Sequence, residues 1–344
     1  MSVVRREARR RWIIVGAALA VLVAVPVGIA TAPAGAEQVP APVLRQRILG
    51  SAGTAFQGYV ETRGTVVLPD LPQLNDLAGL LGGTTSMRVW HAGPRAWRVA
   101  VLDPVGERDT YRTGDATYTW DFSRNLWTEL TGDPAVRLPR AADLLPPDLA
   151  RRLLLDAGAG VPMRSLPGQR IAGIAAAGLR LSPADPDTTI RRVDVWADPG
   201  TGLPLRVDVG SAFSSRFLDL SRTPPSADVV RPRGSSHSGF VTTAQPDVVA
   251  ALNSVAGVGL PGSLAGRARV PGPVEAIAVY GTGLSRFVVV AVPGRLGERT
   301  LAAVREVVQS GTLTVLVARP SRRTYLLAGF VTPALLGRAQ ADLP

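Results

Sequence analysis

The feature that most constrains this fold is the strict alternation at residues 191–209, RRVDVWADPGTGLPLRVDV. Apolar and polar side chains alternate on both sides of an Asp-Pro-Gly-Thr-Gly segment, a pattern that predicts an antiparallel hairpin with one apolar face. That face carries Val193, Val195, Ala197, Leu203, Leu205, Val207 and Val209. Another element must cover it, because apolar surface stabilises a fold only when it is removed from water.

The charged residues of the hairpin suggest its register. If Ala197 faces Leu203, then Asp194 lies opposite Arg206, and Arg192 lies opposite Asp208. Cross-strand pairs of opposite charge are stabilising, whereas like charges directly opposite are destabilising. A shorter loop would set Asp194 against Asp208, so we predict the first register.

The N-terminal residues 1–36 have the features of an export segment. A head containing five arginines and an apolar run at 12–30 precede Ala34-Gly35-Ala36, which is typical of a signal peptide cleaved after Ala36. An uncleaved membrane anchor is the alternative, because the run approaches the roughly 20 residues that span a bilayer. In both cases the arginines stay in the cytoplasm, and the rest of the chain lies on the outside face of the membrane, secreted or anchored.

Composition excludes several kinds of chemistry. The 344 residues include no cysteine, and all 38 basic residues are arginine. Disulfides, thiolate metal sites, a lipid-anchored cysteine and Schiff-base lysines are therefore absent. The net charge of +11 includes the arginines of the export segment, and the other arginines are scattered among acidic residues. This distribution does not indicate nucleic-acid binding, although a basic exported protein can lie near anionic lipid headgroups.

Residues 37–225 predict a large, mainly β domain. Short alternating runs separated by turn residues indicate an antiparallel meander, preceded by a short helix at 43–49. The segment at 71–81 is either a helical flap or a loop. The expected strands are 55–68, 86–91, 97–102, 107–112, 117–122, 126–130, a pair within 167–182, the hairpin, and 213–220.

A leucine-rich segment at 141–157 has helical periodicity and is the natural cover for the apolar sheet face. Pro146 and Pro147 interrupt it, so we predict two short helices. The leucines that face the sheet in this prediction are Leu144, Leu145, Leu149 and Leu153.

Several motifs in this order resemble the MucB/RseB sigma-factor regulators, a branch of the LolA/LppX-like lipoprotein-carrier superfamily. They are Phe56-Gln57-Gly58-Tyr59-Val60, Ile171-Ala172-Gly173, the D-P-x-T-G-L-P hairpin, and Phe217-Leu218-Asp219 before Pro224-Pro225. The resemblance covers roughly residues 45–225. It implies a curved antiparallel half-barrel with a helical lid, and a cavity that accepts acyl chains. The residues expected to line that cavity are Val193, Val195, Leu203, Leu205, Val207, Leu144, Leu145, Leu149 and Leu153.

The C-terminal third predicts a linker and a second domain. Residues 226–245 are rich in Pro, Ser, Gly and Arg without periodicity, which is typical of an interdomain linker. Residues 246–344 predict a small α+β domain that resembles the C-terminal domain of MucB/RseB proteins. Its expected elements are helices at 247–256, 298–308 and 333–342, and strands at 274–280, 286–292, 312–318 and 324–330.

No residue pattern indicates catalysis. The two histidines, His91 and His237, are isolated, and the aspartates Asp185 and Asp187 lie in a proline-rich turn. No motif for a nucleophile, a phosphate-binding loop or a metal site occurs, so we predict no enzyme activity, catalytic residue, metal or cofactor.

Three functions remain open. The first is a regulator that binds a lipid-like ligand in the large domain and a membrane-bound anti-sigma factor through both domains. The second is a lipid or lipoprotein carrier, and the third is an envelope protein with a structural role and no ligand. The two-domain layout favours the regulator.

Overall fold

The structure is a computed structural model that describes residues 38–68, 75–104, 106–132, 137–234, 237–245, 259–272, 277–292, 307–320 and 323–344. The predicted export segment at 1–36 with its cleavage site at Ala36, the helix expected at 247–256, and most of the helix expected at 298–308 lie outside these residues.

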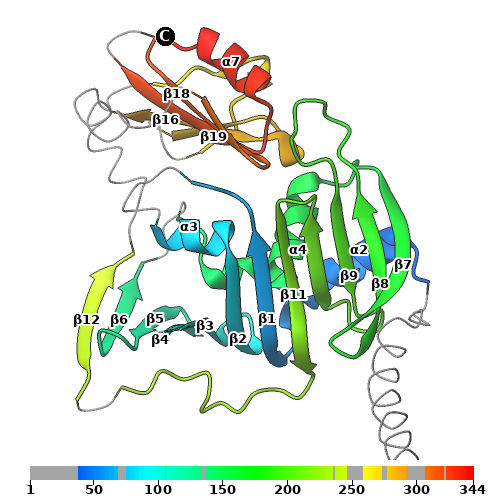
Figure 1. Cartoon of the computed structure of the whole chain (residues 1–344), viewed down its shortest axis with the longest axis vertical. Helices are drawn as coiled ribbons and strands as arrows, with labels where there is room; N and C mark the ends of the chain where they lie inside the picture. The colour runs from blue at the N-terminus through cyan, green and yellow to red at the C-terminus, as the bar shows by residue number, and fades with distance from the viewer. Residues whose placement is uncertain are drawn as a thin grey trace, which may run out of the picture.

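A twelve-stranded open sheet forms the large part of the molecule (Figure 1), in the order β12-β6-β5-β4-β3-β2-β1-β11-β10-β9-β8-β7. The neighbours are antiparallel except β12 and β6, which are parallel. The strands are β1 Phe56–Gly64, β2 Thr84–Gly93, β3 Ala96–Asp103, β4 Gly106–Thr113, β5 Ala116–Asp121, β6 Leu126–Thr131, β7 Met163–Ile171, β8 Ile174–Leu181, β9 Val193–Ala197, β10 Pro204–Val209, β11 Phe213–Ser221 and β12 Gly239–Ala244.

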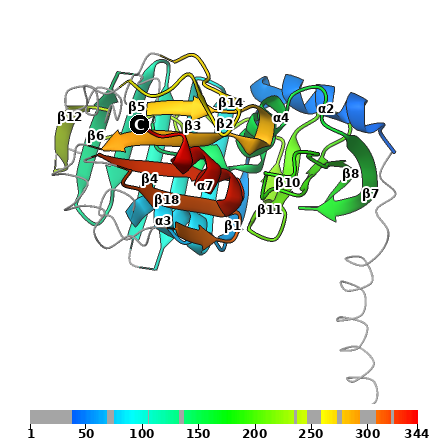
Figure 2. The ribbon, with the colours of Figure 1, turned by 90° about the horizontal axis from the view of Figure 1, so that it is seen from above.

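Helices lie against one face of this sheet (Figures 1 and 2). They are α2 (Ala41–Gly50), α3 (Asn75–Gly82), the 3₁₀ turn η3 (Ala141–Leu144) and α4 (Pro146–Ala157). The predicted break at the two prolines is confirmed, because Pro146 occupies the first turn of α4, where its missing N–H costs no hydrogen bond. The helix ends at Ala157, and the capping Gly158 has a positive φ of 77°, which an L-residue adopts only with strain. The segment at 71–81 was expected to be either a helical flap or a loop. Its described part is helical, as α3.

The apolar faces of α2 and α4 pack on β8, β9 and β10 to form the main core of the large domain. Leu44 and Ile48 of α2 and Leu154 of α4 are fully buried there. At about 25 cal/mol per Å² of apolar surface, side chains of this kind each contribute about 1.5–3 kcal/mol when buried. A second core lies between β1, β2, β3 and the η3–α4 junction, around Phe56, Val60 and Phe217.

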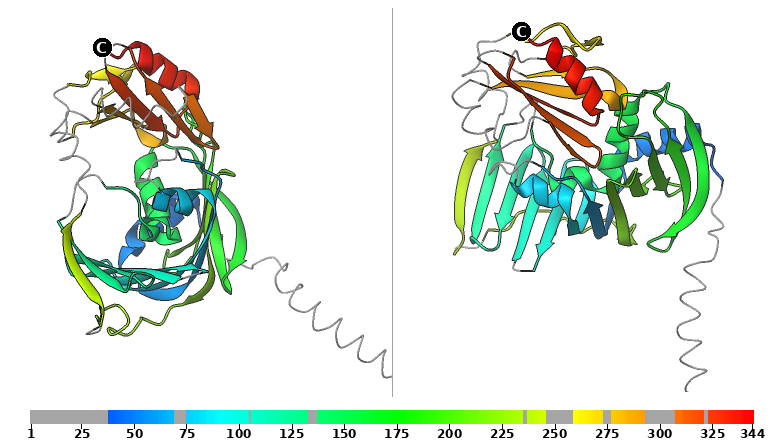
Figure 3. Two further views of the ribbon diagram at one scale, coloured as in Figure 1. Left: turned by 60° about the vertical axis from the view of Figure 1, so that its left-hand side comes forward. Right: turned by 45° about the horizontal axis from the view of Figure 1, so that its top comes forward.

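A separate small sheet forms the C-terminal part, with strand order β15-β16-β19-β18-β17 (Figure 3). The strands are β15 Ile277–Tyr280, β16 Phe287–Val292, β17 Val307–Ser310, β18 Leu313–Ala318 and β19 Thr324–Gly329, with the short pair β13 Ser263–Leu264 and β14 Arg267–Ala268 beside them. Helix α7 (Pro333–Ala341) buries Leu335, Leu336 and Ala339 in this sheet's core, and Thr332 caps its first turn by accepting a hydrogen bond from the Leu335 N–H. The predicted class is confirmed: a mainly β chain with covering helices and a small α+β C-terminal part. The large sheet is open and not a closed barrel.

The predicted register of the β9–β10 hairpin is wrong. Asp194 lies opposite Asp208, and Arg206 lies opposite Trp196, with a register shift between Pro204 and Arg206. Each carboxylate has a cation elsewhere: Arg180 on β8 binds Asp194 with two hydrogen bonds of 2.5 Å, and Arg206 binds Asp208 along its own strand at 2.8 Å. These arginines neutralise the two carboxylates. The preference for opposite charges in cross-strand pairs therefore did not determine the register.

Residues 226–245, predicted as an interdomain linker, contain strand β12. It extends the large sheet by pairing along the whole of β6, from Gly239 opposite Leu126 to Ala244 opposite Thr131. Phe240 and Val241 of this edge strand are exposed. A strand without a buried face needs no alternation of apolar and polar residues, so no strand pattern is visible in the sequence here. The boundaries of the two domains stay a prediction.

Candidate functional site

Two neighbouring pockets lie at η3 and α4, an inner one against strands β2 and β3 and an outer one along α4. The inner pocket has a volume of about 240 Å³ and the outer pocket about 350 Å³. Asp143, Asp148 and Arg151 line both of them. The inner pocket is further lined by Ala52, Val89, His91, Pro94, Trp97, Val99, Ala142 and Leu145.

The wall of the inner pocket is mostly apolar. Val89 and Val99 lie side by side on β2 and β3 because their Cα atoms pair in the sheet register, and each is only 1% exposed. Leu145, which directly precedes α4, faces them from the other side of the same core. The lining is mixed, because these apolar residues stand beside four polar or charged ones, His91, Asp143, Asp148 and Arg151.

His91 is the buried polar group of the inner pocket. Its ring stacks on Phe56 with centroids 4.8 Å apart, and its Nδ1 lies 3.0 Å from the carbonyl oxygen of Thr54. Burial lowers the pKa of His91, and the nearby Asp148 opposes this only in part. The ring is therefore neutral at neutral pH.

Charged side chains surround the apolar part of the pocket. Arg151 donates to Asp148 at 2.6 Å within the first turns of α4. Asp143 accepts two hydrogen bonds from Arg137, at 2.6 and 2.8 Å, and one from the backbone N–H of Arg140. Burial alone would raise the pKa of Asp143, but these hydrogen bonds outweigh it and the pKa is lowered. Asp143 is thus an ionised structural anchor for the η3 turn.

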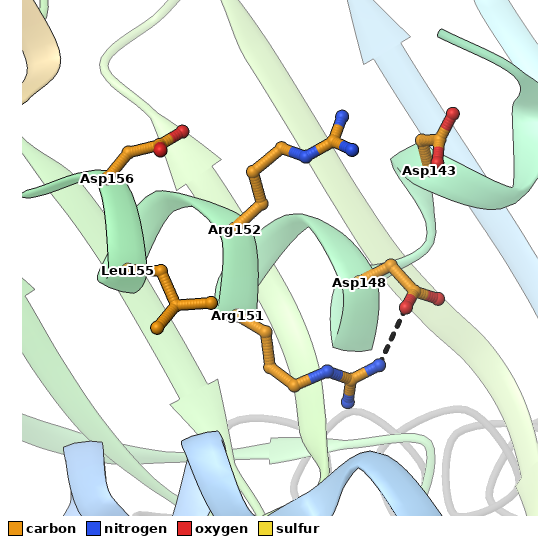
Figure 4. A pocket seen from close by; sticks show the side chains of 6 residues that line it. All are labelled: Asp143, Asp148, Arg151, Arg152, Leu155 and Asp156. Carbon is orange, nitrogen blue, oxygen red and sulfur yellow. Dashed lines mark hydrogen bonds and ion pairs between the residues drawn. The ribbon is translucent and has the colours of Figure 1, made fainter. Parts of the chain in front are cut away.

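The outer pocket follows the exposed side of α4 (Figure 4). Figure 4 shows Asp143, Asp148, Arg151, Arg152, Leu155 and Asp156 along this side, with Arg151 turned toward Asp148. Leu155 is 65% exposed among these charged neighbours. The outer pocket is therefore a charged surface with one apolar side chain, unlike the inner pocket.

The nine residues predicted to line an acyl cavity are brought together, but in two separate packed clusters. Leu144, Val193, Val195 and Val207 are buried in the core under α2 and α4, with Leu149 and Leu153 partly buried beside them. Leu203, Leu205 and Leu145 belong to the second core. Leu145 is the member of this set that lines the inner pocket, and a lipid-lining role for the other eight stays a prediction.

The sequence did not reveal the inner pocket, because its lining comes from five separate elements. From the sequence, His91 was only one of two isolated histidines. The one usable signal was the alternation Val89-x-His91, which places a polar side chain on the buried face of a strand.

Comparison with known proteins gives a consistent picture of the fold. No family model matches the sequence, and no curated protein matches it. Among solved structures, a crystal structure of MucB in complex with MucA(peri) aligns over 88% of this chain and 98% of its own, with 18% identity and a TM-score of 0.50. The fold is MucB-like.

Two further solved structures resemble this chain at lower TM-scores. The Pseudomonas aeruginosa MucA/MucB complex matches at 18% identity and a TM-score of 0.49 over 86% of this chain and 95% of that one. A LolA superfamily protein from Nitrosomonas europaea matches 56% of this chain and 98% of its own, at 14% identity and a TM-score of 0.27. The resemblance predicted from the sequence motifs is confirmed at the level of fold.

Among the described residues, no group of three or more His, Asp or Glu side chains is placed to hold a metal ion. No helix in the described part of this MucB-like chain is both long and apolar enough to cross a bilayer.

Proposed function

We propose that this protein is a non-enzymatic regulator outside the cytoplasmic membrane. In this proposal the large domain binds a lipid-like ligand, and the chain binds the outer region of a single-pass membrane protein of the anti-sigma class. The observation that carries it is the likeness to MucB, solved with MucA(peri), over 98% of the MucB chain and 88% of this one. A likeness of that extent includes the small C-terminal sheet, for which a pure lipid carrier has no evident use.

Contacts between the two sheets support a regulator. Residues of the β8–β9 connection reach the small sheet: Thr188 forms an isolated bridge with Val331, and its buried hydroxyl lies 2.9 Å from the Leu284 carbonyl oxygen. Arg267 binds Asp185 at 2.8 Å and Asp187 at 3.0 Å, and Arg338 also binds Asp187. These aspartates, interpreted from the sequence as turn residues, also join the two parts of the molecule.

Helix α4 connects the candidate site to the small sheet. Its start lines the inner pocket through Asp148 and Arg151, and its last turn binds Arg286 through Asp156 at 3.1 Å. Leu284, from the same small-sheet turn, packs against the core of the large domain. A ligand that moves the start of α4 would therefore act on the domain junction, as a regulator requires.

The test is crosslinking in intact cells, followed by mass spectrometry of the recovered partners. A regulator should yield one single-pass membrane protein, and added amphiphile should reduce its yield because ligand and partner binding are reciprocally linked. Substituting Arg286→Ala should weaken the effect of the amphiphile more than Arg95→Ala, which breaks an exposed ion pair with Asp115 far from the junction.

Two outcomes would contradict the proposal. Recovery of lipoproteins or lipids without any membrane-protein partner would favour a carrier. Recovery of neither partner nor ligand would leave a structural role in the envelope.

A further inference from the structure

The two end strands of the large sheet, β7 and β12, differ in how they resist pairing with a further strand. β7 carries Pro167, a register shift between Leu166 and Gln169, and two exposed arginines, Arg164 and Arg170. Proline, irregular pairing and charge are the features by which natural proteins protect a sheet edge. β12 (GFVTTA) has no proline, no charged residue and no register shift, and all six of its residues are exposed. The edge at β12 is therefore open to another strand.

The pairing of β12 with β6 determines which backbone groups lie at this open edge. The N–H of Gly239 donates to the carbonyl oxygen of Asn125 at 3.0 Å, and the N–H of Gln245 donates to that of Thr131 at 2.8 Å. Backbone groups alternate in direction along a strand, so every second residue of β12 directs its N–H and C=O away from β6. These residues are Phe240, Thr242 and Ala244. Within the described part of the chain, no strand lies beyond β12.

We propose that this edge pairs with the same edge of a second copy of the chain, so that two large sheets join through an antiparallel β12–β12 contact. Thr242 lies opposite Thr242 of the second copy, Phe240 lies opposite Ala244, and Val241 lies opposite Thr243. This interaction goes beyond the proposed function and does not depend on it.

This register uses all the outward backbone groups of both copies. Residues that face each other in an antiparallel pair exchange two hydrogen bonds when both direct their groups toward the partner strand. The two Thr242 residues form one such pair, and Phe240 with Ala244 forms two more. The Ala244 carbonyl oxygen accepts from the Thr243 hydroxyl at 3.5 Å, which leaves its second lone pair for the new bond. A register shifted by two residues would leave an outward residue at each end of the contact without an opposite β12 residue.

The side chains of β12 are complementary to themselves in this register. Self-pairing sets every charge in a strand near a like charge, and β12 carries none. Phe240 is 61% exposed beside Trp127, its neighbour on β6, which packs against Trp120 at 5.1 Å. The small Ala244 of the second copy leaves room for the Phe240 ring, so the contact removes the exposed end of this aromatic row from water.

The contact is small, and its strength follows from its size. A pair of six-residue strands buries far less than the roughly 1,200–2,000 Å² of a stable protein–protein interface. The dimer is therefore weak and forms in proportion to the local concentration of the chain. A strand of another protein can use the same backbone groups, but β12 itself already meets both requirements of the site, outward groups in matching positions and no charge.

Single cysteines test the register directly, because the natural chain has none. The Cα atoms of a hydrogen-bonded antiparallel pair are about 5.5 Å apart, within the roughly 4.4–6.8 Å that a disulfide spans. In intact cells that make the full chain, Thr242→Cys should give a disulfide-linked homodimer after mild oxidation. The matched control Ala244→Cys, on the same exposed edge, lies about 14 Å along the strand from its own copy and should stay monomeric. Cells that make Phe240→Cys and Ala244→Cys together should give the mixed dimer.

Sedimentation velocity of the protein purified as the cell produces it, without detergent, measures the contact without a crosslink. The mass should rise from monomer toward dimer with concentration. Thr242→Pro removes the outward N–H at the centre of the contact in both copies, at a position where an edge strand tolerates proline. It should raise the dissociation constant at least about tenfold, the factor expected for the loss of two hydrogen bonds. The cysteine experiment decides the inference even if Thr242→Pro folds poorly.

Three results would overturn the inference. Thr242→Cys and Ala244→Cys may not crosslink equally, because equal yields indicate random collision. A crosslink from Thr242→Cys to a different protein would assign the edge to that protein. A mass that stays monomeric at every concentration, with no crosslink at Thr242→Cys, would exclude the contact. None of these results affects the proposed function, which is judged by its membrane-protein partner.

Discussion

The two halves of the large sheet differ on the face that the helices cover. Beneath α2 and α4, strands β8, β9 and β10 present a continuous apolar surface that includes Leu179, Val195 and Val207 in one cross-strand row. On the other half, the row that starts at the buried Val99 continues through half-buried threonines, Thr110, Thr119 and Thr128. One row is therefore fully apolar and packed, whereas the other carries half-buried hydroxyl groups.

This difference explains where the inner pocket lies. Val99 is the last residue of the apolar row before the threonines begin, and it lines the pocket. The pocket thus occupies the border between the two halves, where the helical cover ends and apolar and polar side chains meet.

The largest expected difference between the halves is in the free energy of unfolding that is lost when a side chain is shortened to alanine. Leu179→Ala removes a side chain that is 0% exposed and should lower the free energy of unfolding by about 2–5 kcal/mol, since a cavity is left in a packed core. Thr119→Ala, the matched change in the other half, should cost no more than about 0.5 kcal/mol. Urea denaturation measures both, and equal losses would contradict the comparison.

The second prediction concerns ion pairs in the two halves. Arg180→Ala leaves Asp194, whose side chain is 7% exposed, without its two hydrogen bonds and opposite Asp208. It should cost about 1.5–3 kcal/mol, the range for hydrogen bonds to charged groups. Arg95→Ala, which breaks an exposed pair with Asp115, should cost about 0–1 kcal/mol. A second change, Asp194→Asn, should recover part of the loss in the Arg180→Ala background.

The third prediction is a pH dependence that originates in the other half. Burial and the neighbouring Glu107 raise the pKa of Asp109 to about 7, although Arg98 binds it at 2.7 Å. A carboxyl whose pKa is higher in the folded state than in the unfolded chain contributes stability that is fully present below its unfolded pKa, near 4, and is lost as the pH rises through 7. Asp109→Asn should remove this dependence. The prediction is wrong if the difference in unfolding free energy between the original protein and the variant stays constant from pH 5 to pH 8.

The smallest effect is expected at the edge strand β12. Phe240 is 61% exposed, so Phe240→Thr should change the free energy of unfolding by no more than about 0.5 kcal/mol, and thermal unfolding should be nearly unchanged. A loss well above 1 kcal/mol would mean that β12 is part of a core and that the polar half is more strongly packed than its side chains suggest.

Local patterns in the sequence predicted most of the fold. Alternation located the meander strands and the hairpin, Pro146 located the break before α4, and the helix expected at 333–342 matches α7. Each of these signals depends on a residue and its close neighbours in the sequence. They were sufficient to predict the fold class and the MucB-like resemblance.

The errors involve partners that are distant in the sequence. The hairpin register depends on Arg180 of β8, which lies outside the hairpin and neutralises Asp194. Strand β12 depends on β6, which ends before residue 132, and its own exposed side chains carry no period. The inner pocket depends on α4 reaching β2 and β3. Charge pairs and pockets of this kind become visible only when the sheet order is known.

The position of β1 has a consequence for the order in which the molecule assembles. β1 is the first strand to be synthesised and pairs with β2 on one side and with β11, at residues 213–221, on the other. The hairpins from β1 to β6 can form from contacts between consecutive segments. The other edge of β1 pairs only with β11, which is more than 140 residues later in the sequence. Pairing of distant segments is slow, and an unpaired strand edge is open to association with other chains. Until residues 213–221 pair with β1, the folding chain therefore keeps an open strand edge at the middle of its future sheet, where association with other chains can occur.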